Sequence, residues 1–504
     1  MGQSFMAGKL PLSLDRHSNV PLYEQVRSQV ARLITDGELA SGTRLPATRG
    51  LARALRVNRA TIASAYESLA NLGLVRSHVG QGTFVLESGS HRTATPFWPL
   101  SRAMEAASQQ LLHTTPPSAH PDSIDFASLI PDEQLFPIEP FRKTIDTVLR
   151  RRGKELLQYG PVAGYPPLRE YIAAWLAERG VEVTAEHVLI VNGSQQGLDL
   201  VFRALVNPGD SVAVESPTYT VVLPALAYYQ ARVLGIPMTD RGMDLEALES
   251  ALTRGSVRLI YTMPTFHNPT GLTMDLETRR LLLRLAGRHG VPIIEDDFDS
   301  ELRFHGQALP PIKALDADGI VLYLGTFSKG LFPGLRLGWM VAPPELIRTL
   351  SRAKMYTDYH TSMLLQAAVL EFCERGHYRK HLNNLARVNR EKSRNLLRAM
   401  NRHFPSEVSW TEPEGGYAFW IALPDRLSSE VLASQGAREG VLFTPGSQFF
   451  NGHAGDRYLR LSISRVPKDR IEEGVRRLAR LIERQMAQES EQPSPSPGEP
   501  MFHI

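Results

Sequence analysis

The apolar positions near the start of the chain follow a helical period. Between residues 21 and 34 they fall three or four apart, on one face of a helix: Leu22, Val26, Val30, Leu33 and Ile34. A second helix is predicted at about Thr48–Leu55, and a third from Asn58, whose side chain can cap it, to about Leu72. Two short runs with strand character follow at 74–77 and 83–86. Three helices and a β-hairpin in this order predict a winged helix-turn-helix.

From Ile124 onward, helical stretches alternate with short apolar runs. The runs lie at 188–191, 211–214, 259–261, 292–294 and 321–324. Because strands separated by helices pair in parallel, this alternation predicts an α/β domain with a mainly parallel sheet covered by helices. After about Ser351 the pattern changes to long amphipathic helices with strands at 418–421 and 458–463, which predicts a smaller α+β subdomain.

The remaining segments show neither the helical spacing of apolar positions nor the short apolar runs of strands. Residues 88–122 are rich in Ser, Thr, Pro and His, and apart from one short helix near 101–112 we expect a flexible linker. Residues 1–19 are expected to form an N-terminal arm, and the polar, Pro-rich residues 486–504 a disordered tail. The domains are therefore expected at 20–87 and 123–485.

Composition narrows the class of protein. The 504 residues, 42% hydrophobic and 22% charged, are typical of a soluble globular chain of two or three domains. No apolar stretch is long enough to span a membrane, and the N-terminus has no apolar signal core, so a cytoplasmic location is expected. The single cysteine, Cys373, excludes an intrachain disulfide and a cysteine-type zinc site, and no metal is expected.

Positive charge is concentrated in the predicted winged domain. Residues 20–86 contain eight Lys or Arg and four Asp or Glu, a net charge of +4, whereas the whole chain carries +3. Arg49, Arg56 and Arg59 fall at the starts of the second and third helices, where phosphates and base edges would be met. Together with the hairpin, this favours DNA binding over a plain helical domain with solvated arginines.

The most specific motif of the second domain is Gly325-Thr-Phe-Ser-Lys-Gly-Leu-Phe-Pro-Gly-Leu-Arg-Leu-Gly338. Its lysine, Lys329, follows a predicted strand, at the end where open α/β sheets bind ligands. A lysine suits an aldehyde, and the neighbouring Thr326, Ser328 and Arg336 suit a phosphate. An isolated Ser-Lys pair would more simply be a surface loop. The whole motif predicts a site for pyridoxal 5'-phosphate (PLP).

Five further positions offer the chemistry that this cofactor needs. The turn at 193–197 opens a helix and presents backbone N–H groups to a phosphate. Tyr219 can stack on a planar ring, and Asn268 can hydrogen-bond a ring oxygen. Asp296, at the end of a strand, can pair with a pyridine nitrogen and keep it protonated. Arg460 can bind a carboxylate with two nitrogens. Each alone has an ordinary structural explanation, but their combination points to one chemistry.

The N-terminal motifs resemble a known family. The segments that carry the resemblance are Val20–Val26, Gly42–Pro46, Arg49–Ala52, Asn58–Thr61, Ala65–Leu69 and Gly80–Val85. They resemble the DNA-binding domain of GntR regulators, most closely the MocR/GabR branch, in which that domain is fused to an aminotransferase-like one. The resemblance implies that Arg49, Arg59 and Thr61 contact DNA, and that the segment from His78 through Gly80 to Gly82 forms the tip of the wing.

Residues 124–485 resemble the fold-type I aminotransferases of class I/II. The resemblance implies that Lys329 carries PLP as an internal aldimine, that Asp296 pairs with its pyridinium nitrogen, that Asn268 bonds its 3'-oxygen and that Tyr219 stacks on its ring. Arg460 would bind the carboxylate of an effector or substrate. It also implies a homodimer, in which the phosphate is held by Ser194, Gln195, Thr326, Ser328, Arg336 and, from the other subunit, Tyr159.

One position departs from this resemblance. Regulators of the branch, like many aminotransferases, commonly have a tyrosine where this chain has Phe298. A phenol there bonds the 3'-oxygen and lowers the pKa of the aldimine, which Phe298 cannot do. Asn268 is then the identified donor, and efficient transamination is in doubt.

Three functions remain after these observations. The first is a PLP-dependent transcriptional regulator that senses an amine, an amino acid or PLP at Lys329. The second is a catalytic class I/II aminotransferase with an accessory DNA-binding domain. The third is a plain DNA-binding protein whose large domain only dimerises. The recognition helix favours the first over the second, and the intact Lys329, Asp296 and Arg460 favour it over the third. Residual transamination stays open.

Overall fold

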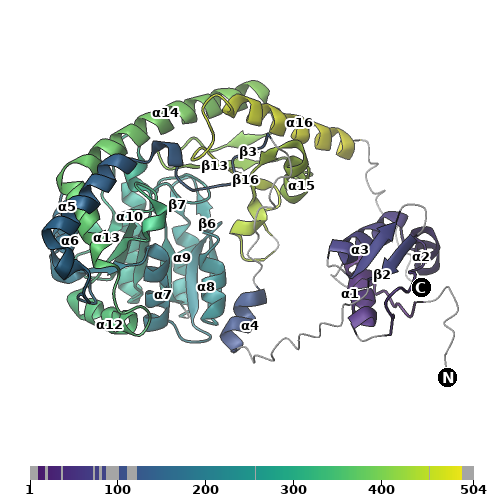
Figure 1. Cartoon of the computed structure of the whole chain (residues 1–504), viewed down its shortest axis with the longest axis horizontal. Coiled ribbons are helices and arrows are strands. Elements are labelled where there is room, and N and C mark those ends of the chain that lie inside the picture. Colours follow the sequence, from purple (N-terminus) through teal and green to yellow (C-terminus); the bar gives the residue numbers. More distant parts are fainter. Residues whose placement is uncertain are drawn as a thin grey trace. The chain divides into compact units, whose positions relative to one another are not determined.

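The computed structural model describes residues 10–16, 21–35, 38–71, 74–78, 82–86, 101–109, 122–255, 257–452 and 454–490. The chain divides into two compact units, Met1–Pro99 and Leu100–Ile504 (Figure 1). The expected wing tip at 79–81, most of the arm and linker, and the end of the expected tail lie outside the described residues.

The first unit is the predicted winged helix-turn-helix. It consists of α1 (Leu22–Thr35), α2 (Thr48–Leu55), α3 (Arg59–Asn71), β1 (Val75–His78) and β2 (Gly82–Val85). The apolar positions of the three helices and the hairpin form one core, with Val26, Val30 and Ile62 completely buried. Asn58 caps α3, because its Oδ1 accepts a hydrogen bond of 2.9 Å from the backbone N–H of Ala60.

The second unit is built on an eight-stranded sheet in the order β4-β11-β10-β9-β8-β5-β6-β7. Its strands are β4 (Val188–Val191), β5 (Ser211–Ser216), β6 (Arg232–Thr239), β7 (Gly242–Met243), β8 (Val257–Thr262), β9 (Ile293–Asp297), β10 (Val321–Thr326) and β11 (Gly338–Val341). The neighbours from β10 through β6 pair in parallel, and only β11 and β7 run against their neighbours. The predicted α/β class is confirmed.

Helices cover this sheet and continue beyond it (Figure 1). They are α5 (Ile138–Leu156), α6 (Pro166–Ala177), α7 (Ser194–Leu205), α8 (Val222–Tyr228), α9 (Leu245–Thr253), α10 (Leu276–His289), α11 (Ile312–Leu315), α12 (Pro344–Met355) and α13 (Met363–Glu374). The short helix α4 (Arg102–Gln109), within the range expected for it, packs against α8. None of the described helices is long and apolar enough to cross a membrane.

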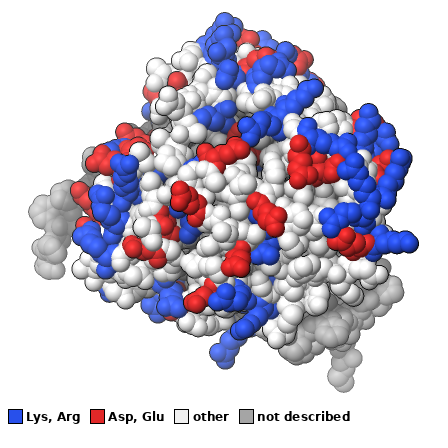
Figure 2. Space-filling view, turned by 90° about the vertical axis from the view of Figure 1, so that its left-hand side faces the viewer, with Lys and Arg blue, Asp and Glu red and all other residues white. Residues whose placement is uncertain are grey.

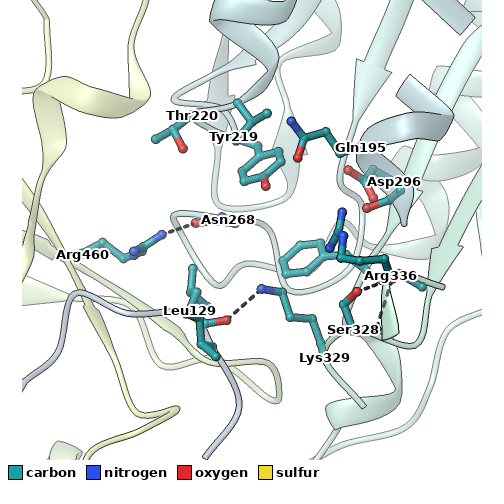
Figure 3. A pocket seen from close by; sticks show the side chains of 15 residues that line it. Leu129, Gln195, Tyr219, Thr220, Asn268, Asp296, Ser328, Lys329, Arg336 and Arg460 are labelled. Atoms are coloured by element: carbon teal, nitrogen blue, oxygen red, sulfur yellow. Dashed lines mark hydrogen bonds between the residues drawn. The ribbon is translucent and has the colours of Figure 1, made fainter. Parts of the chain in front are cut away.

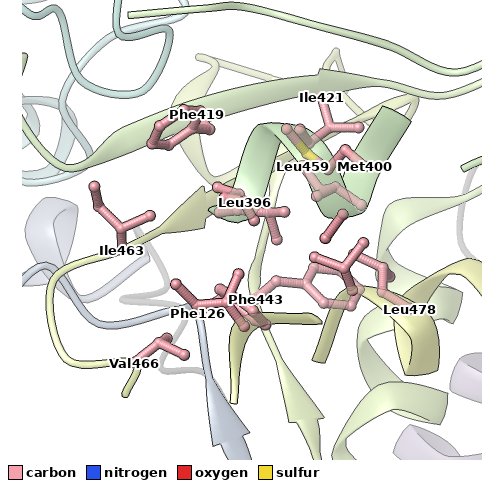
Figure 4. Packing of buried hydrophobic residues seen from close by; sticks show 14 of the residues in the cluster. Phe126, Leu396, Met400, Phe419, Ile421, Phe443, Leu459, Ile463, Val466 and Leu478 are labelled. Atoms are coloured by element: carbon pink, nitrogen blue, oxygen red, sulfur yellow. The ribbon is translucent and has the colours of Figure 1, made fainter. Parts of the chain in front are cut away.

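A smaller α+β subdomain follows, as predicted. A four-stranded antiparallel sheet in the order β12-β13-β16-β15 packs with α14 (His377–His403), α15 (Ser429–Glu439) and α16 (Ile471–Ser490). Its strands are β12 (Ser409–Trp410), β13 (Ala418–Ala422), β15 (Thr444–Pro445) and β16 (Tyr458–Ser462). Leu396 and Met400 of α14 meet Phe419 and Ile421 of β13 in its core (Figure 4).

The chain enters this subdomain directly after the expected linker. Strand β3 (Ile124–Asp125) pairs in parallel with β14 (Val441–Leu442). Phe126, completely buried, then enters the core of the subdomain (Figure 4). Leu129, three residues further on, accepts a hydrogen bond from Lys329, which follows β10, so this segment borders the predicted cofactor site.

Candidate functional site

A cavity of about 290 Å³ opens where the parallel strands of the large sheet end. Its walls are Leu129, Ile130, Ser194, Gln195, Tyr219, Thr220, Val221, Asn268, Asp296, Phe298, Thr326, Ser328, Lys329, Arg336 and Arg460 (Figure 3). Lys329 follows β10 by three residues and Asp296 lies near the end of β9. Parallel strands that end together bring residues far apart in sequence to one edge, which is where open α/β sheets bind ligands.

The ammonium of Lys329 has a single hydrogen bond among the described residues. Its Nζ donates to the carbonyl oxygen of Leu129 over 2.8 Å (Figure 3). Burial lowers the pKa of Lys329 to about 8, and the negative charge of Asp299 opposes this shift. A substantial fraction of the neutral amine is therefore present near neutral pH, and that form attacks an aldehyde.

Only one of the two carboxylate oxygens of Asp296 has a hydrogen-bond partner in the described structure. Its Oδ2 accepts a hydrogen bond of 2.8 Å from the hydroxyl of Tyr261, whereas its Oδ1 is buried without a partner in the described structure. Burial raises the pKa of Asp296 to about 7. An orphaned carboxylate oxygen in an enclosed site is costly unless a ligand donates to it. A protonated pyridine nitrogen would supply that donor, so this residue fits PLP.

Another part of the cavity wall offers hydrogen-bond donors. Helix α7 begins at Ser194, after Gly193 with its φ of 82°, and its first N–H groups are free of intrahelical partners. Arg336 lies alongside, and a Cβ on Gly193 would come within 2.7 Å of its Nη2. Only glycine fits there. The hydroxyl of Thr326 donates to Ser328 over 3.0 Å. Hydroxyls, helix N–H groups and a guanidinium together suit a phosphate.

Arg460 is a buried cation whose hydrogen bonds, within the described structure, all go to neutral oxygens. Its Nη1 donates to Asn268 Oδ1 over 3.0 Å, and its Nη2 to the carbonyl of Ala127 over 2.6 Å and to Thr444 Oγ1 over 3.0 Å. Its Nε is buried without a partner in the described part of the chain. Burial lowers the pKa of Arg460 to about 10. A buried charge of this kind is best stabilised by an anion, and a carboxylate entering the cavity is the natural one.

The remaining expected residues fall in two groups. Tyr219 lines the cavity from the end of β5. Phe298 also lines the cavity, and it brings no hydrogen-bond donor. Tyr159 does not line it: its side chain is 84% exposed and meets Tyr359 edge-on, with ring centroids 5.6 Å apart. A role at the phosphate would therefore have to be played in a second subunit.

Two contributors were not predicted from the sequence. Tyr261, on the strand next to β9, holds Asp296, and its place at the end of an apolar strand was the available signal. Leu129 acts through its backbone carbonyl, which has no sequence signature.

The expected DNA contacts lie on the two helices of the helix-turn-helix. Arg49 is exposed in the first turn of α2, Arg59 is exposed at the first residue of α3, and Thr61 follows, half-buried. Arg44 lies at the base of the wing, with its guanidinium 5.9 Å from the ring centre of Phe84. His78 ends β1, and Gly80 lies outside the described residues.

The comparisons with known proteins match both units. The family described as "Aminotransferase class I and II" matches residues 128–478, and "Bacterial regulatory proteins, gntR family" matches residues 22–85. The probable rhizopine catabolism regulatory protein MocR of Rhizobium meliloti is 35% identical over 87% of this chain and 90% of its own length. The 2-aminoadipate transaminase of Thermus thermophilus is 40% identical over 72% of this chain and 90% of its own.

A solved structure extends the match to the fold. The α-aminoadipate aminotransferase LysN of Thermus thermophilus, complexed with N-(5'-phosphopyridoxyl)-L-leucine, has a TM-score of 0.71 and 38% identity. The match covers 77% of this chain and 100% of that one.

Proposed function

Since the chain belongs to the class I and II aminotransferase family and carries a GntR-family DNA-binding domain, we propose that it is a transcriptional regulator that senses a small amine or amino acid at Lys329. The observation that carries the proposal is that one chain joins a winged helix-turn-helix to a cavity lined by Lys329, Asp296 and Arg460. A relative named as a regulator matches both units over most of its length, which supports the same conclusion.

The cofactor is pyridoxal 5'-phosphate. When bound, it supplies an electron sink for bonds at the carbon that bears the amine. Lys329 would bind its aldehyde, Asp296 its ring nitrogen, Asn268 its 3'-oxygen and Tyr219 the face of its ring. Its phosphate would be held by Ser194, Gln195, Thr326, Ser328 and Arg336.

The effector would be held by the same enclosed groups. Arg460 already donates to Asn268 and to backbone oxygen, and a carboxylate would replace these weaker neutral acceptors. A Lys329 amine set free by an incoming amine has the carbonyl of Leu129 as its acceptor. Both groups touch the segment Ala127–Leu129, which follows the linker to the DNA-binding domain. Binding of an effector would therefore change contacts of the segment where that linker joins the large unit.

Two features support a homodimer. Leu157, Tyr159 and Tyr356 are 69%, 84% and 83% exposed, and such large apolar side chains are typically covered by a partner. A dimer would also place Tyr159 at the phosphate of the second subunit. Each winged helix-turn-helix would contact one half-site through Arg49, Arg59 and Thr61.

The test is a DNA-binding assay on the upstream region of the protein's own gene, with and without PLP and candidate amines. Wild-type protein should be yellow and should change its affinity when an effector is added. Lys329→Ala should be colourless, should bind the duplex and should no longer respond to the effector. A wild-type protein that takes up no PLP would refute the proposal.

The DNA-binding role is tested separately. Arg59→Ala should weaken specific binding by about 1–3 kcal/mol if Arg59 contacts a base. Arg32→Ala on α1 is the control, because Arg32 is exposed on a helix that does not belong to the helix-turn-helix pair. Equal affinities of the two variants at matched salt would remove Arg59 from the interface.

A second candidate is a catalytic aminotransferase with an accessory domain. The 40% identity to a transaminase favours it. Phe298 speaks against it, because this wall residue offers no hydroxyl at the position where many aminotransferases have a tyrosine. Single-turnover spectra with amino acids distinguish the two: repeated turnover with a keto acid would support catalysis, whereas a stable change without turnover supports sensing.

A further inference from the structure

Helix α14 carries a continuous row of exposed cations that neither the cofactor site nor the winged helix uses. The row, which we call the α14 basic ridge, consists of Arg379, Lys380, Arg387, Arg390, Arg394, Arg398 and Arg402. From Arg387 to Arg402 its members recur at three- and four-residue intervals, and together with Arg379 and Lys380 they lie on the side of the helix opposite the buried Leu396 and Met400. From Arg379 to Arg402 the ridge is about 35 Å long at ~1.5 Å per residue.

Acidic side chains neutralise the ridge only in part. Arg379 pairs with Glu178 at 3.0 Å, Arg387 with Glu391 at 3.2 Å and Arg402 with Glu472 at 2.8 Å. Among the described residues, no carboxylate is within ion-pair distance of the other four, which are Lys380, Arg390, Arg394 and Arg398. Three of these follow one another at four-residue spacing in the second half of the helix.

This charge pattern works against the stability of the helix. Arg390, Arg394 and Arg398 are like charges at i and i+4, which repel one another on a helix surface. Arg379 and Lys380 lie in the first turn, where the helix dipole disfavours cations. A helix that is merely solvated usually alternates its charges. The unbalanced row therefore indicates an anionic partner.

One position on the ridge already has the form of a phosphate site. Arg390 and Arg394 line a recess of about 340 Å³ with the segment Arg303–Gly306. The Nε of Arg390 donates to the carbonyl of Phe304 over 2.7 Å, which fixes the guanidinium and leaves its Nη groups without a partner in the described structure. Arg303 is paired with Glu414, so it adds little net charge.

We propose that the α14 basic ridge is a second DNA-binding surface, which holds the phosphate backbone of duplex DNA. This proposal rests on the DNA-binding part of the proposed function. The length of the ridge is close to one turn of B-DNA, ~34–36 Å, so cations spaced along it can meet phosphates on both edges of a groove. The upper end of the face in Figure 2, the height at which α14 runs in Figure 1, is rich in Lys and Arg. The contacts are to phosphates and therefore carry no sequence preference.

The experiment compares two double variants of the full-length, PLP-loaded protein on a random-sequence 40-bp duplex. Arg394→Gln/Arg398→Gln removes two ridge cations. Arg280→Gln/Arg284→Gln on α10 is the matched control, because these arginines are also exposed, four residues apart and without a carboxylate partner among the described residues. The dissociation constant is measured from 50 to 300 mM KCl.

Each lost phosphate contact should reduce the slope of log K against log [KCl] by about 0.9. The ridge variant should therefore lose about 1.8 from the slope and bind at least tenfold more weakly at 100 mM KCl, while the control keeps the wild-type values. Equal slopes for the ridge variant and the control would overturn the proposal and point to an acidic protein as the partner of the ridge.

The outcome is separable from that of the proposed function. A random duplex requires neither operator nor effector, and PLP absorbance reports the state of Lys329 in both variants. A protein that fails to respond to amines, yet shows the slope change, would keep the ridge and lose the sensing role. The reverse result would lose only the ridge.

Discussion

Lys329 is a lysine whose surroundings set its reactivity before any ligand arrives. Burial lowers its pKa from 10.5 to about 8, so the neutral amine gains population as pH rises through about 8. The rate of PLP uptake by the cofactor-free protein should therefore rise with a midpoint near pH 8. Stopped-flow absorbance measures this rate. Free Nα-acetyl-lysine is the control, with a midpoint near ~10.4; the same midpoint in the protein would mean that Lys329 is not desolvated.

The stability that Asp296 contributes decreases as pH rises, whereas the neutral amine of Lys329 gains population. Burial raises its folded-state pKa from 3.8 to about 7, so the protonated form is favoured in the fold. Its contribution to the free energy of unfolding is complete below pH 3.8 and is lost as pH rises through 7. In the cofactor-free protein, Asp296→Asn should therefore reduce the fall in melting temperature between pH 5 and 7.5. Calorimetry of the two proteins checks this.

The same substitution should weaken the binding of PLP. Asn cannot balance a pyridinium charge, and losing one partner of a buried pair costs about 3 kcal/mol, or roughly 100-fold in affinity. Titration with PLP at pH 8 measures this loss, with Asp296→Glu as the variant that keeps the charge. Equal affinities for wild type and Asp296→Asn would exclude Asp296 as the partner of the ring nitrogen.

Phe298 is the wall residue where a hydroxyl would matter most. Phe298→Tyr should add a donor to the cavity and lower the pKa of the bound chromophore by about one unit, because a hydrogen bond favours the charged oxygen. Spectrophotometric titration measures that pKa, and Phe298→Leu is the control that changes packing without adding a donor. An identical shift in both variants would show that the phenol is not near the ring oxygen.

At the scale of elements, the cap of α3 should decide the stability of the DNA-binding unit. Asn58→Ala removes the 2.9 Å bond to Ala60 and should cost about 1 kcal/mol. For a domain of this size, that corresponds to a decrease in melting temperature of about 4–8 °C. Scanning calorimetry of the full chain should show the change in the transition of the first unit only. Asn58→Asp keeps an acceptor and should stay close to wild type.

Elements with a strong periodic signal were predictable, and those without one were not. Strand β4 was predicted with its observed bounds because Val188–Val191 is a continuous apolar run buried on both faces. Strand β9 begins at Ile293 instead of Pro292, since proline cannot donate to the ladder. Strand β6 was missed because only Ile236 of its eight residues is buried, so it lacks the apolar run of an inner strand.

The residues of the site also divide into those with a sequence signal and those without one. Lys329 and Asp296 could be identified because they stand at or just after strand ends in recognisable motifs, and Arg460 because it is a charged residue within the apolar strand β16. The carbonyl of Leu129 could not, because any residue has one and only the fold brings it to Lys329 across 200 positions. Tyr159 was identified as a phosphate contact, yet it lies outside the cavity of its own subunit, so its role stays a prediction.

That role depends on the whole molecule. Tyr159 meets Tyr359, and we group these two exposed side chains with the exposed Leu157 and Tyr356, which are within three residues of them in sequence, as one apolar patch. Covering such a patch in a homodimer would bury it and bring Tyr159 to the other subunit. The affinity for PLP should then depend on the association of the two subunits.

Leu157→Asp/Tyr356→Asp should convert the dimer to a monomer, because two carboxylates cannot be buried unpaired in an apolar interface. Analytical ultracentrifugation measures the state, with Val431→Asp as the control, since Val431 is 46% exposed on α15, away from the patch. The monomer should bind PLP at least tenfold more weakly. Tyr159→Phe should stay dimeric and still lose about tenfold in affinity, the equivalent of one hydrogen bond to a charged group, ~1.5–3 kcal/mol. A monomeric double variant with wild-type affinity would place the whole phosphate site within one subunit.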